Sequence, residues 1–125
     1  MFHKVIVANR GAVANRVLRA LRALDIRSVA VYSEADAGAP YLALADESYL
    51  LGPAPVRESY LDVEAILKVV QASGADALHP GYGFLSENAA FARRVEEAGC
   101  RFIGPSPRWI DAMGHKTRAR DLAEQ

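Results

Sequence analysis

Short apolar runs alternate with segments of helical spacing along most of this chain, and that alternation limits the possible folds more than any other feature. The runs are rich in β-branched residues and bounded by turn residues, as expected of strands buried on both faces of a sheet. We predict strands at residues 5–8, 28–32, 48–51, 75–78 and 101–103. The order predicts an α/β fold, a Rossmann-like, doubly wound parallel sheet of about five strands with flanking helices.

The segments between the runs have helical periodicity and recognisable ends. After the first run, an apolar stripe predicts a helix that continues through Asp25, with arginines off the stripe. The stripe consists of Val13, Val17, Leu21 and Leu24. A capping box at residues 59–62 predicts the start of the next helix, and Gly74 its end. Ser86 is the expected N-cap of a later helix that ends at Gly99.

Composition restricts the classes of function. The chain has 125 residues, 51% hydrophobic and 24% charged, which suits one soluble globular domain. Fifteen acidic residues balance fifteen basic ones, so bulk charge favours neither a nucleic acid nor a membrane partner. The one cysteine, Cys100, excludes an internal disulfide and a cysteine-based zinc cluster, and we expect it in or near the core. No apolar run approaches the ~18 residues of a membrane span, and the composition predicts a cytoplasmic protein.

Turn residues follow the predicted strands, where a doubly wound fold binds its ligands. Residues 9–11, 33–36, 79–83 and 104–105 should therefore form one rim of the sheet. The most distinctive segment is 79–88, which reads HPGYGFLSEN. Gly81 and Gly83 flank Tyr82, and glycine allows backbone conformations and close approaches that other residues do not. From these residues alone, an ordinary strand-to-helix turn is an equal alternative to a ligand-binding turn.

The chain lacks the residue patterns that several common binding sites and catalytic sites need. A dinucleotide fingerprint needs three glycines after the first strand, but only Gly11 is present, although Glu34 or Asp36 resembles the ribose-binding acid. No Gly-Lys-Ser/Thr follows a glycine-rich loop. The three histidines lack the spacing of metal ligands, and Cys100 with His79 is no evident nucleophile pair. We therefore expect no metal site and no catalytic residues in this chain.

Six motifs, in order, resemble the N-terminal domain of biotin carboxylases. They are residues 7–11 (VANRG), 29–33 (VAVYS), 45–47 (ADE), 59–61 (SYL), 79–88 and 102–105 (FIGP). The resemblance extends from Phe2 to about Lys116, and the decapeptide 79–88 is its most specific part.

The resemblance implies a division of the chain and a chemistry. Residues 1–115 would be the pre-ATP-grasp domain and residues 116–125 the start of a truncated ATP-grasp region. The family couples ATP hydrolysis to bicarbonate activation, through carboxyphosphate, and carboxylates the ureido nitrogen of biotin. The complete enzyme would use ATP, Mg²⁺ and biotin, with none expected on this fragment. The metal-binding acids and catalytic residues would lie beyond Gln125, so the fragment alone should be inactive.

A few positions carry implied roles. Lys116 matches a lysine that contacts the phosphates of ATP, and Tyr82 and Gly83 fall where the family brings biotin close. Arg16 and Arg19 match arginines on a helix that pairs subunits, which favours that role over the solvated helix face that the residues alone suggest. Implied partners are the ATP-grasp and C-terminal biotin carboxylase domains, a biotinylated carrier domain and a second subunit.

Departures from the family pattern leave the carboxyl acceptor open. Ala12, Tyr41 and His115 replace the usual Glu, His and Asp. Residues 10–12, 33–36 and 116–123 resemble the urea carboxylase branch, but acyl-CoA and pyruvate carboxylases share the domain. Two further hypotheses are a docking or dimerisation module without chemistry, and another ATP-grasp ligase such as a carbamoyl-phosphate synthetase. The decapeptide argues for the biotin branch over such ligases.

Overall fold

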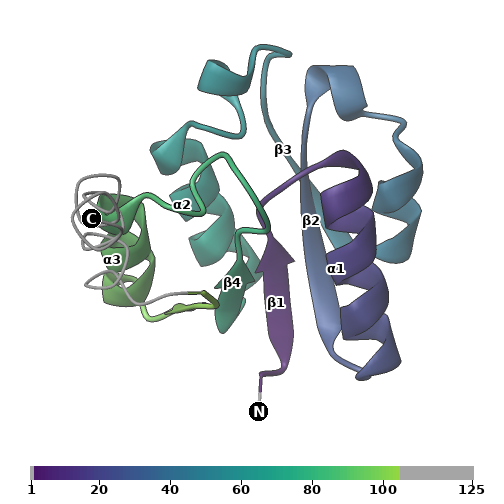
Figure 1. The fold of residues 1–125 in the computed structure, drawn as a ribbon, viewed down its shortest axis with the longest axis horizontal. Helices are drawn as coiled ribbons and strands as arrows, with labels where there is room; N and C mark the ends of the chain where they lie inside the picture. The colour runs from purple at the N-terminus through teal and green to yellow at the C-terminus, as the bar shows by residue number, and fades with distance from the viewer. Residues whose placement is uncertain (1, 105–125) are drawn as a thin grey trace, which may run out of the picture.

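The computed structural model describes residues 2–104, which form one parallel sheet with helices on both faces (Figure 1). The strand order is β3-β2-β1-β4-β5, and every neighbouring pair is parallel. The strands are β1 (Lys4–Val7), β2 (Arg27–Ser33), β3 (Glu47–Gly52), β4 (Ala77–His79) and β5 (Arg101–Phe102). The predicted doubly wound sheet of about five strands is confirmed.

Three α-helices connect the strands. They are α1 (Gly11–Ala23), α2 (Val63–Ser73) and α3 (Ala89–Glu97). Short 3₁₀ turns follow β2 and β3, namely η1 (Glu34–Asp36), η2 (Pro40–Leu44) and η3 (Val56–Glu58). In Figure 1, α1 lies to the right of β1, and α2 and α3 lie to its left. No helix in residues 2–104 is long and apolar enough to cross a membrane.

The core is divided by the sheet because successive strand residues point to opposite faces. On one face Val5 and Val7 pack with Ala14 and Leu18 of α1. On the other face Ile6 belongs to the cluster that includes the buried residues of α2 and α3. Cys100 belongs to that second cluster and is buried, as predicted.

The predicted apolar stripe of α1 is wrong in part. The residues that α1 buries are Ala14, Leu18 and Leu21. Of the predicted stripe, Val13 and Val17 are only partly buried and Leu24 is 64% exposed. The helix is apolar over two adjacent stripes. The sequence periodicity predicts the stripe that includes Val13 and Val17, whereas packing on the sheet buries the adjacent stripe of Ala14 and Leu18.

Two predicted helix starts are also wrong. The N-cap of α3 is Asn88, whose Oδ1 accepts the Phe91 N–H at 2.9 Å, and not Ser86. The N-cap of α2 is Asp62, whose Oδ1 accepts the Ala65 N–H at 3.1 Å. The proposed capping box at 59–62 does not form, because the Ser59 hydroxyl donates to the Pro55 carbonyl instead.

Asn88→Ala should therefore lower the free energy of unfolding by about 1 kcal/mol, because it removes the acceptor for the Phe91 N–H. Ser86→Ala, two residues earlier, should change it by a few tenths of a kcal/mol at most. Urea unfolding followed by circular dichroism measures both. A larger effect at Ser86 than at Asn88 would return the cap to Ser86.

Other predicted ends are confirmed or shifted. Gly74 ends α2 in the left-handed conformation, with φ 66°, and Gly99 follows α3 with φ 86°. The predicted fourth strand, 75–78, instead covers Ala77–His79. The predicted helical segments after Ser106, the domain boundary at 115–116 and Lys116 lie outside the described residues.

Candidate functional site

Three loops meet at the carboxyl edge of the sheet. They follow β1, β2 and β4, and their contacts join residues far apart in the sequence. The Asn9 side chain bonds to the turn after β4, and the neighbouring Arg10 side chain bonds to Asp36 in η1. The predicted rim therefore forms, for the three of its four loops that lie wholly within the described residues.

The turn after β4 depends on left-handed backbone at three residues. Gly81 has φ 67°, Gly83 φ 68° and Phe84 φ 48°. The Gly81 N–H donates to His79 Nδ1 at 3.0 Å, and the Ser86 N–H donates to the Gly83 carbonyl at 2.9 Å. The Tyr82 side chain is 70% exposed at the tip, so the turn holds an aromatic ring out to solvent. Glycine is required at Gly81 in particular, because a Cβ there would lie 2.6 Å from Val13 Cγ1.

The neutral form of the His79 imidazole stabilises this turn. Its Nδ1 accepts the Gly81 N–H, so the ring proton is on Nε2. Burial lowers the pKa of His79 below its ordinary value. Protonation of Nδ1 would remove the only acceptor atom in that contact.

Acidification should therefore weaken the fold through His79. Because the folded pKa is lowered, the unfolded chain binds more protons between the two pKa values, and stability falls as the pH drops below about 6.5. His79→Asn keeps a side-chain acceptor for the Gly81 N–H but does not titrate. The loss of unfolding free energy between pH 7.5 and 5.5 should be smaller in His79→Asn than in the wild type. Equal losses would show that His79 is not linked to folding.

A second cluster joins the loops after β1, β2 and β3. The Arg10 guanidinium donates two hydrogen bonds to the Asp36 carboxylate, both at 2.6 Å, and Asp36 is 7% exposed. The Tyr60 hydroxyl donates to Asp36 Oδ2 at 2.5 Å and accepts the Ser33 N–H at 3.0 Å. The hydrogen bonds from Arg10 hold the pKa of Asp36 below its ordinary value, against the effect of burial.

This cluster also reaches the glycine turn. The Tyr60 ring stacks on Phe84, with ring centroids 5.3 Å apart. Tyr41 is buried and donates its hydroxyl to the Val31 carbonyl at 2.8 Å. Burial raises the pKa of the Tyr41 hydroxyl, so it stays protonated as a donor. The sequence places Asp36 on the rim and Tyr60 in a family motif, but it does not predict that the two side chains meet, because they come from loops after different strands.

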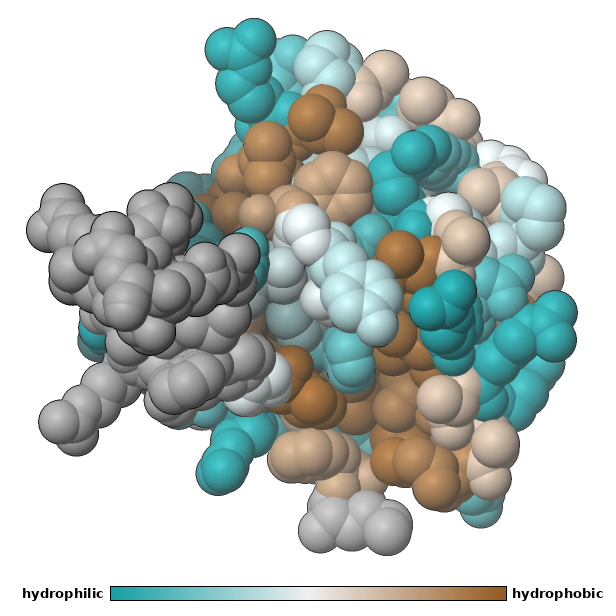
Figure 2. Space-filling model, in the orientation of Figure 1, coloured by the Kyte–Doolittle hydropathy of each residue, from teal (hydrophilic) through white to brown (hydrophobic). Residues whose placement is uncertain are grey.

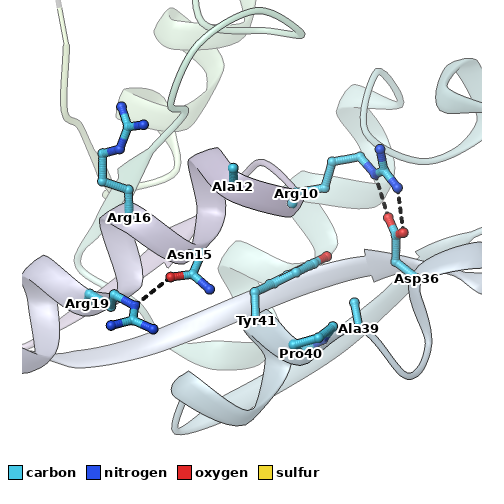
Figure 3. A pocket seen from close by; sticks show the side chains of 10 residues that line it. Arg10, Ala12, Asn15, Arg16, Arg19, Asp36, Ala39, Pro40 and Tyr41 are labelled. Carbon is cyan, nitrogen blue, oxygen red and sulfur yellow. Dashed lines mark hydrogen bonds and ion pairs between the residues drawn. The ribbon is translucent and has the colours of Figure 1, made fainter.

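Arg16 and Arg19 line a hollow beside the N-terminal half of α1, of about 590 Å³, together with Arg10 (Figure 3). Arg19 Nε donates to Asn15 Oδ1 at 2.6 Å. In Figure 3 Arg16 points away from Tyr41, while Arg10 turns toward Asp36. Both predicted interface arginines are therefore on the outside of α1, and no acidic side chain occurs in its first turn.

An apolar groove of about 430 Å³ lies beside α1, next to the part of the sheet where β1 pairs with β4. Figure 2 shows brown, hydrophobic side chains in that part of the face. The groove is lined by the outer stripe of α1 and by residues of the strands and the glycine turn, including Val13, Val17, Leu24, Ile103, Gly81 and Tyr82. Tyr82 therefore stands at the edge of an apolar surface, and Arg16 lines both this groove and the hollow beside it.

The described residues offer no group of three or more His, Cys, Asp or Glu that could hold a metal ion. Lys116, predicted to contact ATP, lies outside residues 2–104.

The fold and the glycine turn together define a class: a small α/β domain whose loops after β1, β2 and β4 are joined at the carboxyl edge of a parallel sheet. The family model for the biotin carboxylase N-terminal domain matches residues 1–110. The chain belongs to this family.

Individual relatives agree. A biotin carboxylase from Halalkalibacterium halodurans is 56% identical over 120 residues, 96% of this chain and 26% of its own length. The mitochondrial pyruvate carboxylase of Rattus norvegicus is 55% identical over 122 residues, 96% of this chain and 10% of its own. The crystal structure of Kluyveromyces lactis urea carboxylase superposes with a TM-score of 0.92 at 42% identity, covering 98% of this chain and 11% of that one. The chain thus spans a minor part of each relative's length.

Proposed function

We propose that this chain is the N-terminal domain of a biotin-dependent carboxylase, and that the glycine turn after β4 faces biotin in the complete enzyme. The observation that carries the proposal is the turn itself. It holds Tyr82 70% exposed beside an apolar groove, with left-handed glycines on both sides. Family membership supports the same conclusion.

In the complete enzyme, biotin supplies the ureido nitrogen that accepts a carboxyl group from bicarbonate, with MgATP as the energy source. This chain contributes positioning and shape. Tyr82 offers a ring face for packing, and Gly83 lets the backbone approach the ligand closely. Lys116 would contact the phosphates of ATP, and the catalytic residues would belong to the sequence after Gln125.

The apolar groove is the surface on which we expect further domains of the enzyme to pack. It is lined by Leu24, which is 64% exposed, and by Val13, Val17 and Ile103. Exposed apolar surface of this kind usually marks an interaction site. The partners we propose are the downstream ATP-grasp and C-terminal domains and a biotinylated carrier domain. The cytoplasmic location stays a prediction from composition.

Release of ADP by the native protein that contains this chain and its downstream sequence tests the proposal. We expect release to require bicarbonate and to increase with free biotin, while the 125-residue chain alone is inactive. Absence of any bicarbonate-dependent ADP release by the complete protein would contradict the proposal. Adding urea, acetyl-CoA or pyruvate in turn then identifies the acceptor, which the similarity to both pyruvate and urea carboxylases leaves open.

A second role, subunit pairing, is favoured by one observation. Arg16 and Arg19 line a hollow on the outside of α1, and no acid lies in the first turn of the helix, while Asp36 in the same hollow is paired with Arg10. We propose that this surface meets acidic groups of a second subunit. Light scattering at low and high salt tests it, because a dimer held by such charges should dissociate as the ionic strength rises.

A further inference from the structure

The Asn9 side chain connects the end of β1 to both sides of Gly81. Asn9 is 2% exposed, and its Nδ2 donates to the Pro80 carbonyl at 2.9 Å and to the Tyr82 carbonyl at 2.7 Å. Its Oδ1 accepts the Arg10 N–H at 2.8 Å. The amide group thus uses both of its donor hydrogens on one turn and its acceptor on the residue that follows it.

These contacts fix the orientation of the peptide group that joins Tyr82 to Gly83. In a planar trans peptide the carbonyl and the N–H point in opposite directions, and the described residues contain no cis peptide. Because the Tyr82 carbonyl points to Asn9, the Gly83 N–H on the same peptide points away from it. Among residues 2–104, no group accepts a hydrogen bond from that N–H.

The neighbouring peptide is held in the same way. The Pro80 carbonyl also points to Asn9, so the Gly81 N–H points to the opposite side, where His79 Nδ1 accepts it at 3.0 Å. Contact is close enough that a Cβ on Gly81 would lie 2.8 Å from Asn9 Nδ2. Asn9 and His79 therefore hold Gly81 from two sides, and Tyr82 and the Gly83 N–H are left as the outward groups of the turn.

We propose that Asn9 is a positioning residue for biotin. It sets the direction of the Gly83 N–H and the position of Tyr82 without touching the ligand. This inference rests on the proposed function of the turn. An amide is needed because two carbonyl oxygens must be met by two donor hydrogens. Aspartate has the same shape but would place a carboxylate against both carbonyls, which repels them.

Asn9→Asp in the complete native protein tests the proposal, with Asn88→Asp as the matched control. Asn88 uses only its Oδ1, as the N-cap of α3, and aspartate caps as well as asparagine does. Asn9→Asp should raise the KM for free biotin about tenfold or more, because a small displacement of positioning groups is costly. The KM for MgATP should stay unchanged, and Asn88→Asp should change neither constant. If Asn9→Asp does not fold, Asn9→Ala, which removes the donors without adding charge, serves for the same comparison.

A second readout does not depend on activity. In the 125-residue chain carrying isotope-labelled glycine, Asn9→Asp should shift or broaden the amide resonances of Gly81 and Gly83, while those of Gly74 and Gly99 stay in place. An unchanged KM for biotin in an active enzyme, or unmoved Gly81 and Gly83 resonances, would overturn the inference alone. A wild-type protein that does not use biotin would overturn the proposed function, and the inference with it.

Discussion

Gly81→Ala should lower the free energy of unfolding by about 3 kcal/mol, through left-handed strain and overpacking together. The new Cβ would lie 2.6 Å from Val13 Cγ1 and 2.8 Å from Asn9 Nδ2, at a backbone φ of 67°. Asn9 has little room to move, because it is buried and is bonded to the turn on both sides of Gly81. The turn would separate from Asn9, so biotin use by the complete protein should fall with stability.

Gly74→Ala separates the two causes. Gly74 has nearly the same φ, 66°, but a Cβ there meets nothing within 4 Å. This variant should lose only the cost of the left-handed conformation, about 1–2 kcal/mol, with unchanged biotin use. Urea unfolding of both variants measures the difference. Equal losses would mean that the contact of Gly81 with Val13 and Asn9 does not constrain the turn.

Asp36→Asn should lower the free energy of unfolding by about 2–3 kcal/mol, the range for buried hydrogen bonds to a charged group. The substitution keeps the shape but replaces one carboxylate oxygen with an N–H₂ group. That group faces the Arg10 guanidinium and the Tyr60 hydroxyl, which are both donors. The loops after β1, β2 and β3 would lose their common acceptor.

The pH dependence has a definite sign. The pKa of Asp36 is lowered in the fold, chiefly by hydrogen bonds from Arg10. Its stabilising effect is therefore full above the unfolded pKa of about 4 and is lost as the pH falls through the lower folded value. The difference between wild type and Asp36→Asn should be largest near pH 7 and shrink below about pH 4.

The exposed pair of Glu64 and Arg94 is the control for this comparison. Glu64→Gln should cost about 0.5 kcal/mol or less, because solvent screens a surface ion pair. Denaturant unfolding at several pH values measures both variants. If Asp36→Asn costs no more than Glu64→Gln, the buried cluster does not stabilise the rim.

Local patterns were sufficient to predict the layers of this fold. Val5, Ile6 and Val7 lie in a continuous apolar run, which is typical of a strand buried on both faces of a sheet, and all three are buried. The errors occurred where a local signal had two solutions. On α1, Leu21 belongs to both possible stripes, and packing on the sheet selected Ala14 and Leu18 over Val13 and Val17.

The part of the site made by neighbouring residues could be predicted from the sequence, and the part made by distant residues could not. Gly81, Tyr82 and Gly83 are adjacent, so the unusual turn could be recognised in the sequence itself. Its supports are distant: Asn9 meets the turn across 71 to 73 residues, and Arg10 meets Asp36 across 26. Only the sheet topology, which places the ends of β1, β2 and β4 side by side, brings these residues together.

Transfer of label from radioactive bicarbonate to free biotin by the complete native protein tests the central claim most directly. We predict labelled biotin when MgATP is present and none when it is omitted, with far less label in Gly81→Ala than in Gly74→Ala. Formation of ADP with bicarbonate but without any label on biotin would contradict the claim. Such a result would assign the domain to another kind of ATP-dependent ligase.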